Sequence, residues 1–253
     1  MYKIPAKTLF MGQKLIYVPE CHSTNSMLSE LAAGSDLPEG TVVVTDHQTK
    51  GRGQRGNSWQ SAKGQNLTLS ILLKPKFLEI KDQFQLSMAI SLGVAACLRE
   101  LVSMIVSLKW PNDVFIGERK VGGILIENQT QGAALTGTIL GIGLNINQSN
   151  HAVPNAGALI DFTGKFTDLN WIFDKLMGAL EASYLDLRSG NAAGIRKKYL
   201  ESLYQFNRPQ SFESAGEQFI GIISDVDAYG RLCVQTGGTT RKFSHQEIRM
   251  LPG

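Results

Sequence analysis

The spacing of apolar residues divides the first part of the chain into strands and helices. Leu67, Leu69, Ile71 and Leu73 alternate with other residues between positions 65 and 73, which predicts a strand with one buried face. From Asp82 to Leu101, apolar residues instead recur at helical spacing, with Asp82 as the cap and Gln85 at the capping-box position. The other elements expected here are strands over 14–18 and 40–46 and a short helix over 26–33.

Strand patterns follow one another closely in the middle of the chain. They cover residues 105–110, 114–116, 121–127 and 135–147, and a hairpin connection is expected at 117–119. Two helices are expected afterwards, over 169–187, with a stripe of Trp171, Leu176, Leu180 and Tyr184, and over 192–204. Because helices bracket hairpin-linked strands, the sequence predicts an α+β fold with a mainly antiparallel sheet.

The pattern changes after Asn207-Arg208-Pro209. Short β segments are expected at 219–226, 231–236 and 241–243, separated by turns that contain glycine. Such closely spaced strands in fewer than fifty residues predict a small barrel-like module. We therefore expect two domains, residues 1–206 and residues 207–253.

Composition and charge narrow the setting. The chain has 253 residues and a net charge of +3, which permits an anionic ligand but does not by itself indicate nucleic acid. Its three cysteines are scattered without metal spacing, and its four histidines, His22, His47, His151 and His245, also lack it. With no signal pattern and no apolar run of membrane-spanning length, we expect a cytoplasmic protein with free thiols and no membrane partner.

The segment 50–59, Lys-Gly-Arg-Gly-Gln-Arg-Gly-Asn-Ser-Trp, carries the most distinctive chemistry. Its glycines allow close approach to a ligand, and its arginines offer planar forks for carboxylate or phosphate oxygens. A basic surface turn or an RNA contact of the RGG kind is the alternative interpretation. The segment is not a Walker A loop, because no Gly-Lys-Ser/Thr follows.

Four further clusters extend the pattern: Ser23-Thr24-Asn25, Gln48, the pair formed by 109–113 (Lys-Trp-Pro-Asn-Asp) and 120–127 (Lys-Val-Gly-Gly-Ile-Leu-Ile-Glu), and 141–147 (Gly-Ile-Gly-Leu-Asn-Ile-Asn). In this order and at these separations, the five clusters resemble biotin–protein ligases. The resemblance is strong over residues 23–147 and weaker in the C-terminal module.

The resemblance implies a fold and a reaction. The catalytic domain would resemble class II aminoacyl-tRNA synthetases, with a mixed sheet backed by helices, and an SH3-like barrel would follow it. The biotin carboxylate would attack the α-phosphate of ATP, with Mg²⁺ present, giving biotinyl-5′-AMP and pyrophosphate. A lysine of a biotin carboxyl-carrier protein domain would then attack the mixed anhydride, so no nucleophilic Ser or Cys is required.

The resemblance also implies residue roles. Arg52 and Lys120, with Arg55 as a further phosphate contact, would supply the fixed cations that the meeting of two anions requires. Asp113 would contact Mg²⁺, which prefers carboxylate and phosphate oxygens. The expected ATP contacts are Arg52, Arg55, Trp59 as adenine platform, Asn112, Asp113, Lys120 and Asn145. The expected biotin contacts are Ser23, Thr24, Asn25, Gln48, Arg52, Gly53, Gln54, Lys120, Gly123, Leu125 and Gly141.

Several of these residues have a structural alternative. Ser23 and Thr24 could only cap a helix, and the glycines at 141 and 143 could serve tight packing rather than admit the ligand. Lys109 either contacts the ligand or pairs with a carboxylate on the sheet surface. We expect Trp110 and Pro111 to be core and turn residues, and Glu127 to be salt-bridged or exposed.

The sequence departs from the family at three places. Gln54 and Asn57 stand where relatives commonly carry arginine, which predicts weaker retention of biotinyl-AMP. Arg249 is offset from a C-terminal arginine that reaches the nucleotide in some relatives, so that role is not transferred.

The residues before Cys21 are too few for a helix-turn-helix domain, which predicts a ligase without a repressor arm and without a DNA partner.

Two other functions remain open on sequence grounds. A lipoate or octanoate ligase shares the fold and the acyl-adenylate chemistry, but Gln48 and Ser23-Thr24 favour the polar ureido head of biotin. A non-catalytic nucleic-acid-binding protein would use the basic segment and the terminal barrel, against which the modest net charge argues. A homodimer is also possible, through a sheet edge expected near residues 135–147.

Overall fold

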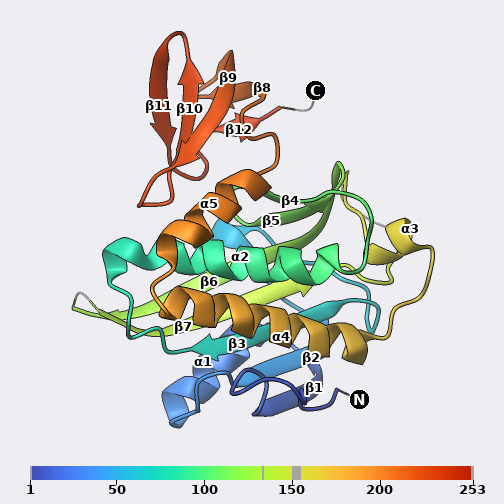
Figure 1. The fold of residues 1–253 in the computed structure, drawn as a ribbon. Coiled ribbons are helices and arrows are strands. Elements are labelled where there is room, and N and C mark those ends of the chain that lie inside the picture. The colour runs from blue at the N-terminus through green and yellow to red at the C-terminus, as the bar shows by residue number, and fades with distance from the viewer. Residues whose placement is uncertain (1, 133, 150–154, 252–253) are drawn as a thin grey trace.

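A seven-stranded sheet forms the larger part of the molecule (Figure 1). The computed structural model describes residues 2–132, 134–149 and 155–251. The strand order in this sheet is β1-β2-β3-β7-β6-β5-β4. The strands are β1 Leu15–Cys21, β2 Val42–Gln48, β3 Leu67–Leu73, β4 Val106–Lys109, β5 Asp113–Ile116, β6 Arg119–Gln131 and β7 Ala134–Leu144.

Strands β1 and β2 run parallel, and the other neighbours in this sheet pair antiparallel. The parallel pair needs a crossover, which helix α1 (Thr24–Gly34) supplies. The β5–β6 connection is a hairpin, as the sequence predicts for residues 117–119, and β6 and β7 are also antiparallel neighbours. The expected α+β arrangement with a mainly antiparallel sheet is confirmed.

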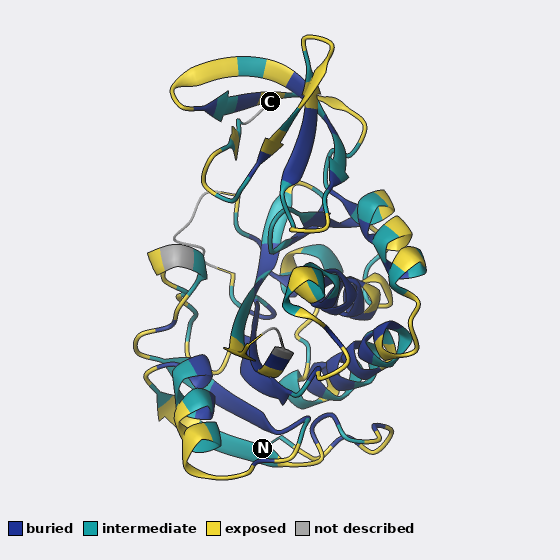
Figure 2. Ribbon diagram, turned by 90° about the vertical axis from the view of Figure 1, so that its left-hand side faces the viewer, coloured by how far each residue is buried: buried dark blue, intermediate teal, exposed yellow. Residues whose placement is uncertain are grey.

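Two long helices cover one face of the sheet (Figure 1). These are α2 (Gln83–Arg99) and α4 (Leu169–Arg188), and their apolar side chains join those of the strands in the main core. On the other face, α1 covers β2, β3 and β7 over a smaller cluster that includes Leu28, Val43 and Ile139. Figure 2 shows the buried residues concentrated in the strands and in the helix sides turned toward them. Because α1 covers only part of its face, the ends of the central strands remain available for a pocket.

Strand β3 differs from its expected burial. All seven of its residues are buried, so the prediction of one exposed face is wrong. The reason is that helices cover β3 from both sides, and polar residues such as Ser70 are buried in the interior instead of facing water. Alternation alone could not reveal the second covering layer.

Strand β7 is also placed differently from its expected position. It pairs with β3 along one side and with β6 along the other, so it lies inside the sheet. The prediction of an exposed edge near residues 135–147 is therefore wrong. Strands β1 and β4 form the two edges, and β4 is bridged at Leu108 to Leu203.

The helices agree with the predicted ranges apart from local details. Helix α5 covers Ala192–Ser202, and the short helix α3, Leu159–Thr163, was not predicted. Asp82 precedes α2, but its carboxylate accepts a hydrogen bond from the Gln85 side chain at 3.1 Å instead of capping the backbone. Trp171 is 45% exposed and lies beside the Lys175 ammonium, so it does not belong to the buried stripe.

A second sheet of five antiparallel strands follows helix α5 and stands beside the larger sheet at its β4–β5 end (Figure 1). Its order is β11-β10-β9-β8-β12, with bounds β8 Pro209–Ser214, β9 Glu217–Val226, β10 Leu232–Thr236, β11 Thr239–Phe243 and β12 Arg249–Met250. Strands β8 and β12 were not predicted. Across the described ranges, no helix combines the length and apolar character needed to cross a bilayer.

Candidate functional site

A cavity of about 300 Å³ lies between segment 50–59, the ends of β5, β6 and β7, and the second sheet. Fourteen of the sixteen predicted site residues line it: Ser23, Thr24, Asn25, Gln48, Arg52, Gly53, Gln54, Trp59, Asn112, Asp113, Lys120, Gly123, Leu125 and Gly141. They come from segments spread between Ser23 and Gly141 in the chain, which the sheet brings together. The side chain of Arg55 lies outside the described residues, and Asn145 donates its amide to the Gly157 carbonyl at 3.0 Å.

The floor of the cavity is formed by glycines on adjacent strands. Gly123 of β6 pairs with Gly143 of β7. The Trp59 indole lies directly over Gly143, where an added Cβ would come 2.4 Å from Trp59 Cε2. The indole nitrogen of Trp59 is buried without a hydrogen-bond partner among the described residues. Glycine at position 143 thus leaves space for the Trp59 ring. From the sequence, we expected this space to be filled by the ligand instead.

Gly141 provides the same kind of space for Asn25. An added Cβ at Gly141 would lie 2.3 Å from Asn25 Oδ1. That oxygen is 2.5 Å from the Ser70 hydroxyl, and the Asn25 amide nitrogen donates to Glu127 at 2.7 Å. The missing side chain on β7 therefore fixes a buried asparagine at one end of the cavity.

Ser23 and Thr24 do more than begin a helix. Ser23 occupies the N-cap position of α1, but its side chain makes no capping hydrogen bond. The Thr24 backbone N–H donates to Gln48 Oε1 at 2.7 Å, and the Thr24 hydroxyl lies 3.1 Å from the same oxygen. Ser23 and Thr24 are buried polar residues beside the cavity, an arrangement that favours the binding role over the capping role.

Segment 51–59 closes on itself as a narrow hairpin. Arg52 forms a β-bridge with Ser58, and the Trp59 N–H donates to the Gly51 carbonyl at 2.9 Å. An added Cβ at Gly51 would lie 2.3 Å from the Trp59 carbonyl oxygen, so this position requires glycine. The hairpin places Arg52 and Trp59 against the ends of the central strands.

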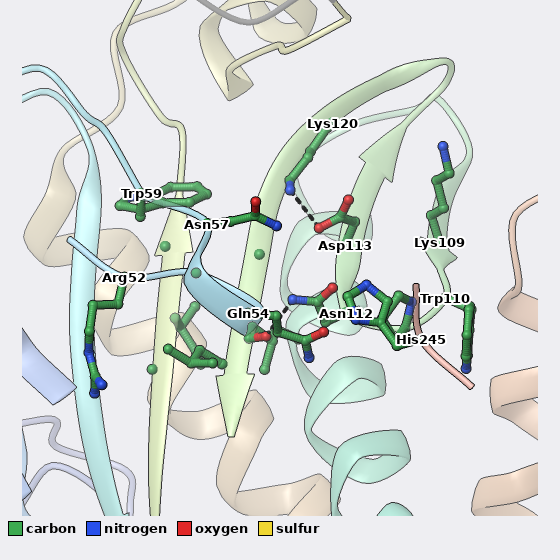
Figure 3. Close-up of a pocket in the computed structure, with 18 of the residues that line it drawn as sticks. Arg52, Gln54, Asn57, Trp59, Lys109, Trp110, Asn112, Asp113, Lys120 and His245 are labelled. Carbon is green, nitrogen blue, oxygen red and sulfur yellow. Dashed lines mark hydrogen bonds and ion pairs between the residues drawn. The ribbon is translucent and has the colours of Figure 1, made fainter. Parts of the chain in front are cut away.

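Both predicted cations are paired with carboxylates. Arg52 Nη2 lies 2.6 Å from Glu127 Oε2, and Lys120 Nζ lies 2.6 Å from Asp113 Oδ1. The expectation that Glu127 is salt-bridged is confirmed. In Figure 3 the Arg52 side chain lies at the lower left, apart from Lys120, whose ammonium meets Asp113 near the centre. The two predicted cations therefore lie at separate points of the cavity, and each is paired with an acid.

The loop between β4 and β5 contributes residues that sequence reasoning set aside. Trp110 and Pro111 line the cavity, although they were expected to be only core and turn residues. The Trp110 indole N–H donates at 2.9 Å to the carbonyl of Gly230, in the turn between β9 and β10, and the ring meets His245 edge to face. Asn112 uses its amide nitrogen to bind the Ile124 carbonyl at 2.9 Å.

Lys109 lies in an apolar setting at the same end of the cavity. Its ammonium is 5.3 Å from the Phe115 ring centroid and 5.9 Å from that of Tyr204. Burial lowers the pKa of Lys109, and the nearby Asp113 carboxylate acts in the opposite direction. Lys109 is thus a partly desolvated cation among the residues that line the cavity.

The second sheet supplies a wall that the sequence did not predict. Phe212, Ile223, Leu232, Ile248 and Arg249 line the cavity from this side. Arg249, whose role was not transferred from relatives, forms an ion pair with Glu213 at 2.7 Å. Residue spacing gave no signal for these contacts, because they depend on how the two sheets are oriented.

Among the described residues, the histidines take part in no metal centre. His22 lies near Glu30 and His47 near Glu20, while His151 lies outside the described residues. Across the residues that the structure describes, no group of three or more His, Cys, Asp or Glu side chains could hold a metal ion. The cavity thus brings together two carboxylate-paired cations, the Trp59 ring and a glycine floor.

Comparisons with known proteins agree with this geometry. Residues 17–145 match the model of the biotin/lipoate A/B protein ligase family. The chain is 32% identical over 241 residues to the biotin–[acetyl-CoA-carboxylase] ligase of Mycobacterium tuberculosis, covering 93% of this chain and 88% of that relative. It is 28% identical over 249 residues to the bifunctional ligase/repressor BirA of Bacillus subtilis, covering 96% and 76%. A biotin protein ligase from Aquifex aeolicus, solved with biotin and ATP, superposes with a TM-score of 0.79 at 27% identity, covering 95% and 100%.

Proposed function

This chain belongs to the biotin/lipoate A/B protein ligase family, and from that membership we infer that it attaches biotin to a lysine of biotin carboxyl-carrier protein domains in an ATP-dependent reaction. The reaction passes through biotinyl-5′-AMP and releases pyrophosphate. The observation that carries this function is the cavity itself. It combines a polar end, two separated cations and an aromatic ring over a glycine floor, which are the contacts that biotin and ATP require.

The polar end favours biotin over lipoate or octanoate. Thr24, Gln48 and Asn25 supply donors and acceptors beside the cavity, as an ureido ring needs. A dithiolane or a simple acyl chain has no hydrogen-bonding groups to offer this polar end, whereas the ureido ring of biotin has both donors and acceptors. We assign Leu125 and Gly123 to the floor beneath the ligand, and Ser23 to the contacts of the ring.

The two cations act on the reacting anions. We assign Arg52 and Lys120 to the biotin carboxylate and the α-phosphate, whose mutual repulsion they reduce in the transition state. Each must leave its present carboxylate partner, Glu127 or Asp113, when the ligands bind. We assign the face of the Trp59 ring that points away from Gly143 to adenine, and we assign Gly53 and Gln54 of the hairpin to biotin.

Mg²⁺ fits the site only together with the nucleotide. Asp113 is the one acidic cavity residue among the predicted contacts, and a magnesium ion commonly uses one or two protein carboxylates plus substrate phosphates. Asp113 would hold the ion beside the phosphates after giving up Lys120. The ion would neutralise charge on the phosphate oxygens.

The finer architecture extends the same proposal. Residues 1–206 form a catalytic domain like that of class II aminoacyl-tRNA synthetases, and residues 207–253 form an SH3-like module that closes the cavity. The free thiols of Cys21, Cys97 and Cys233 support a reducing, cytoplasmic compartment. A homodimer stays a prediction, without the support that an exposed β7 edge would have given.

The test is a transfer assay with competing acids. The protein is mixed with ATP, Mg²⁺, a carrier domain, and either biotin, lipoate or octanoate, and the carrier is weighed by intact mass. We expect biotin alone to appear on one lysine, with pyrophosphate released in equal amount. Transfer of lipoate or octanoate in preference to biotin would overturn the assignment, and an electrophoretic shift on DNA without any transfer would favour a nucleic-acid-binding protein.

A further inference from the structure

A continuous series of polar contacts joins the polar end of the cavity to the hairpin arginine. Each successive pair lies within hydrogen-bond distance, between 2.5 and 3.1 Å. The series runs through Gln48, Thr24, Ser70, Asn25, Glu127 and Arg52. The groups proposed to bind the ring of biotin are therefore linked to the group proposed to bind its carboxylate.

Glu127 is the point at which this series meets the hairpin. One of its oxygens, Oε2, accepts from both Asn25 Nδ2 at 2.7 Å and Arg52 Nη2 at 2.6 Å. Asn25 is buried and fixed by Ser70 and by the lack of a side chain at Gly141. The Glu127 carboxylate is therefore held in place from the sheet side, whereas its contact with Arg52 is made by a side chain on a hairpin.

The ion pair is accessible and therefore exchangeable. The Arg52 side chain is 44% exposed and that of Glu127 is 38% exposed. Ion pairs with this degree of exposure are weak, because water and salt screen the charges. A second carboxylate or a phosphate that reached the guanidinium could replace Glu127 at little cost.

We propose that Glu127 is a positioning residue that holds Arg52 in the ligand-free protein and yields it to the anionic group of the bound ligand. The inference rests on the proposed function, since it takes the ligand to be biotin and its adenylate. In the ligand-free protein, Glu127 offers Arg52 a carboxylate, which is the same functional group that biotin offers it when bound. Its negative charge also opposes the approach of a second anion.

Loss of the Glu127 charge should tighten, not weaken, the binding of an anionic ligand. Removing the charge of Glu127 raises the free energy of the ligand-free state, where the pair exists, but not that of the bound state, where Arg52 has left it. Binding of an anionic ligand must then become tighter, by up to about fivefold for a pair of this exposure. A residue that only supports the fold would weaken binding when changed.

The decisive variant is Glu127→Gln, which keeps an oxygen for Asn25 but removes the charge. Calorimetry compares the binding of biotin with that of biotinol, the uncharged alcohol analogue, to wild type and variant. We expect biotin to bind up to about fivefold tighter to the variant and biotinol to bind equally to both. Glu20→Gln, which removes a charge near His47 away from the cavity, is the matched control and should change neither.

Two further measurements keep the proposal testable. In an Arg52→Gln background, Glu127→Gln should no longer tighten biotin binding, because the pair is already absent. Without ligand, trypsin should cut after Lys50, Arg52 or Arg55 faster in Glu127→Gln than in wild type, because the hairpin has lost its tether. This second readout does not depend on which ligand the protein binds.

Each outcome is informative. Weaker or unchanged biotin binding by Glu127→Gln, tightening that persists without Arg52, or unchanged trypsin cleavage would overturn the role of Glu127. If wild type binds neither biotin nor biotinol, the proposed function fails and the inference fails with it. If wild type binds biotin but Glu127→Gln binds it more weakly, the role of Glu127 is refuted and the proposed function stands.

Discussion

Replacing Gly143 by alanine tests the contact between the floor of the cavity and Trp59. An ideal Cβ at this position would lie 2.4 Å from Trp59 Cε2, 2.5 Å from Cζ2 and 2.9 Å from Cδ2. All three distances are shorter than carbon atoms tolerate, and β7 cannot retreat because it is paired on both sides. The indole must therefore move away from the strand.

The size of the effect follows from the role proposed for the ring. Stacking of a base on an aromatic side chain contributes roughly 1–3 kcal/mol, so displacement of the indole should raise the KM for ATP by about 5- to 150-fold. Biotin binding at the polar end should change much less. The measurement is steady-state pyrophosphate release with ATP and biotin varied separately, supported by thermal melting.

Two other glycines provide matched controls. At Gly123, on the paired position of β6, an added Cβ would meet Trp59 Cζ3 at 3.5 Å, an ordinary contact, so Gly123→Ala should be milder. Gly178 lies in α4 with no atom within 4 Å of its added Cβ, and Gly178→Ala should keep the KM and gain about 0.5–1 kcal/mol in stability. A Gly143→Ala protein that keeps the wild-type KM for ATP would refute the placement of adenine on Trp59.

Four further substitutions probe other parts of the cavity. Arg52→Ala and Lys120→Ala should each cost ~3–4 kcal/mol of transition-state stabilisation in adenylation, measured as the rate of pyrophosphate release. Lys175→Ala, which changes a distant lysine, is the control. Undiminished adenylation in either the Arg52 or the Lys120 variant would exclude the changed residue from the reaction. Gly141→Ala should displace Asn25 and weaken biotin binding by about 1–3 kcal/mol in calorimetry, and unchanged affinity would count against Asn25. Gln54→Arg should slow the release of labelled biotinyl-AMP by up to about fivefold, and equal off-rates would contradict the effect expected of the missing arginine.

Local patterns in the sequence were sufficient for the main elements and for the residues of the site. Hydrophobic spacing located the strands from β1 to β7 and the helices α1, α2, α4 and α5, because each buries a regularly spaced set of side chains. The five ordered clusters identified fourteen residues that line one cavity. These features depend on short stretches of sequence, or on the order in which such stretches follow one another along the chain.

Features that depend on tertiary neighbours were not predictable in this way. The two-sided burial of β3 and the interior position of β7 follow from strand pairings between distant segments. The cavity wall from β8 to β12, the contact of Trp110 with Gly230, and the occupants of the space above Gly141 and Gly143 also require the assembled molecule. No spacing rule distinguishes a glycine that admits ligand from one that admits a neighbouring side chain.

The central position of β7 has a consequence for how the protein loses activity. Gly141 and Gly143 belong to a strand with hydrogen-bonded neighbours on both sides, so their amide protons should exchange with deuterium only when the entire sheet opens. The cavity floor would then be among the last parts of the molecule to loosen on heating. Inactivation below the melting temperature should accordingly begin in the hairpin that carries Arg52 and Trp59, while the floor remains protected.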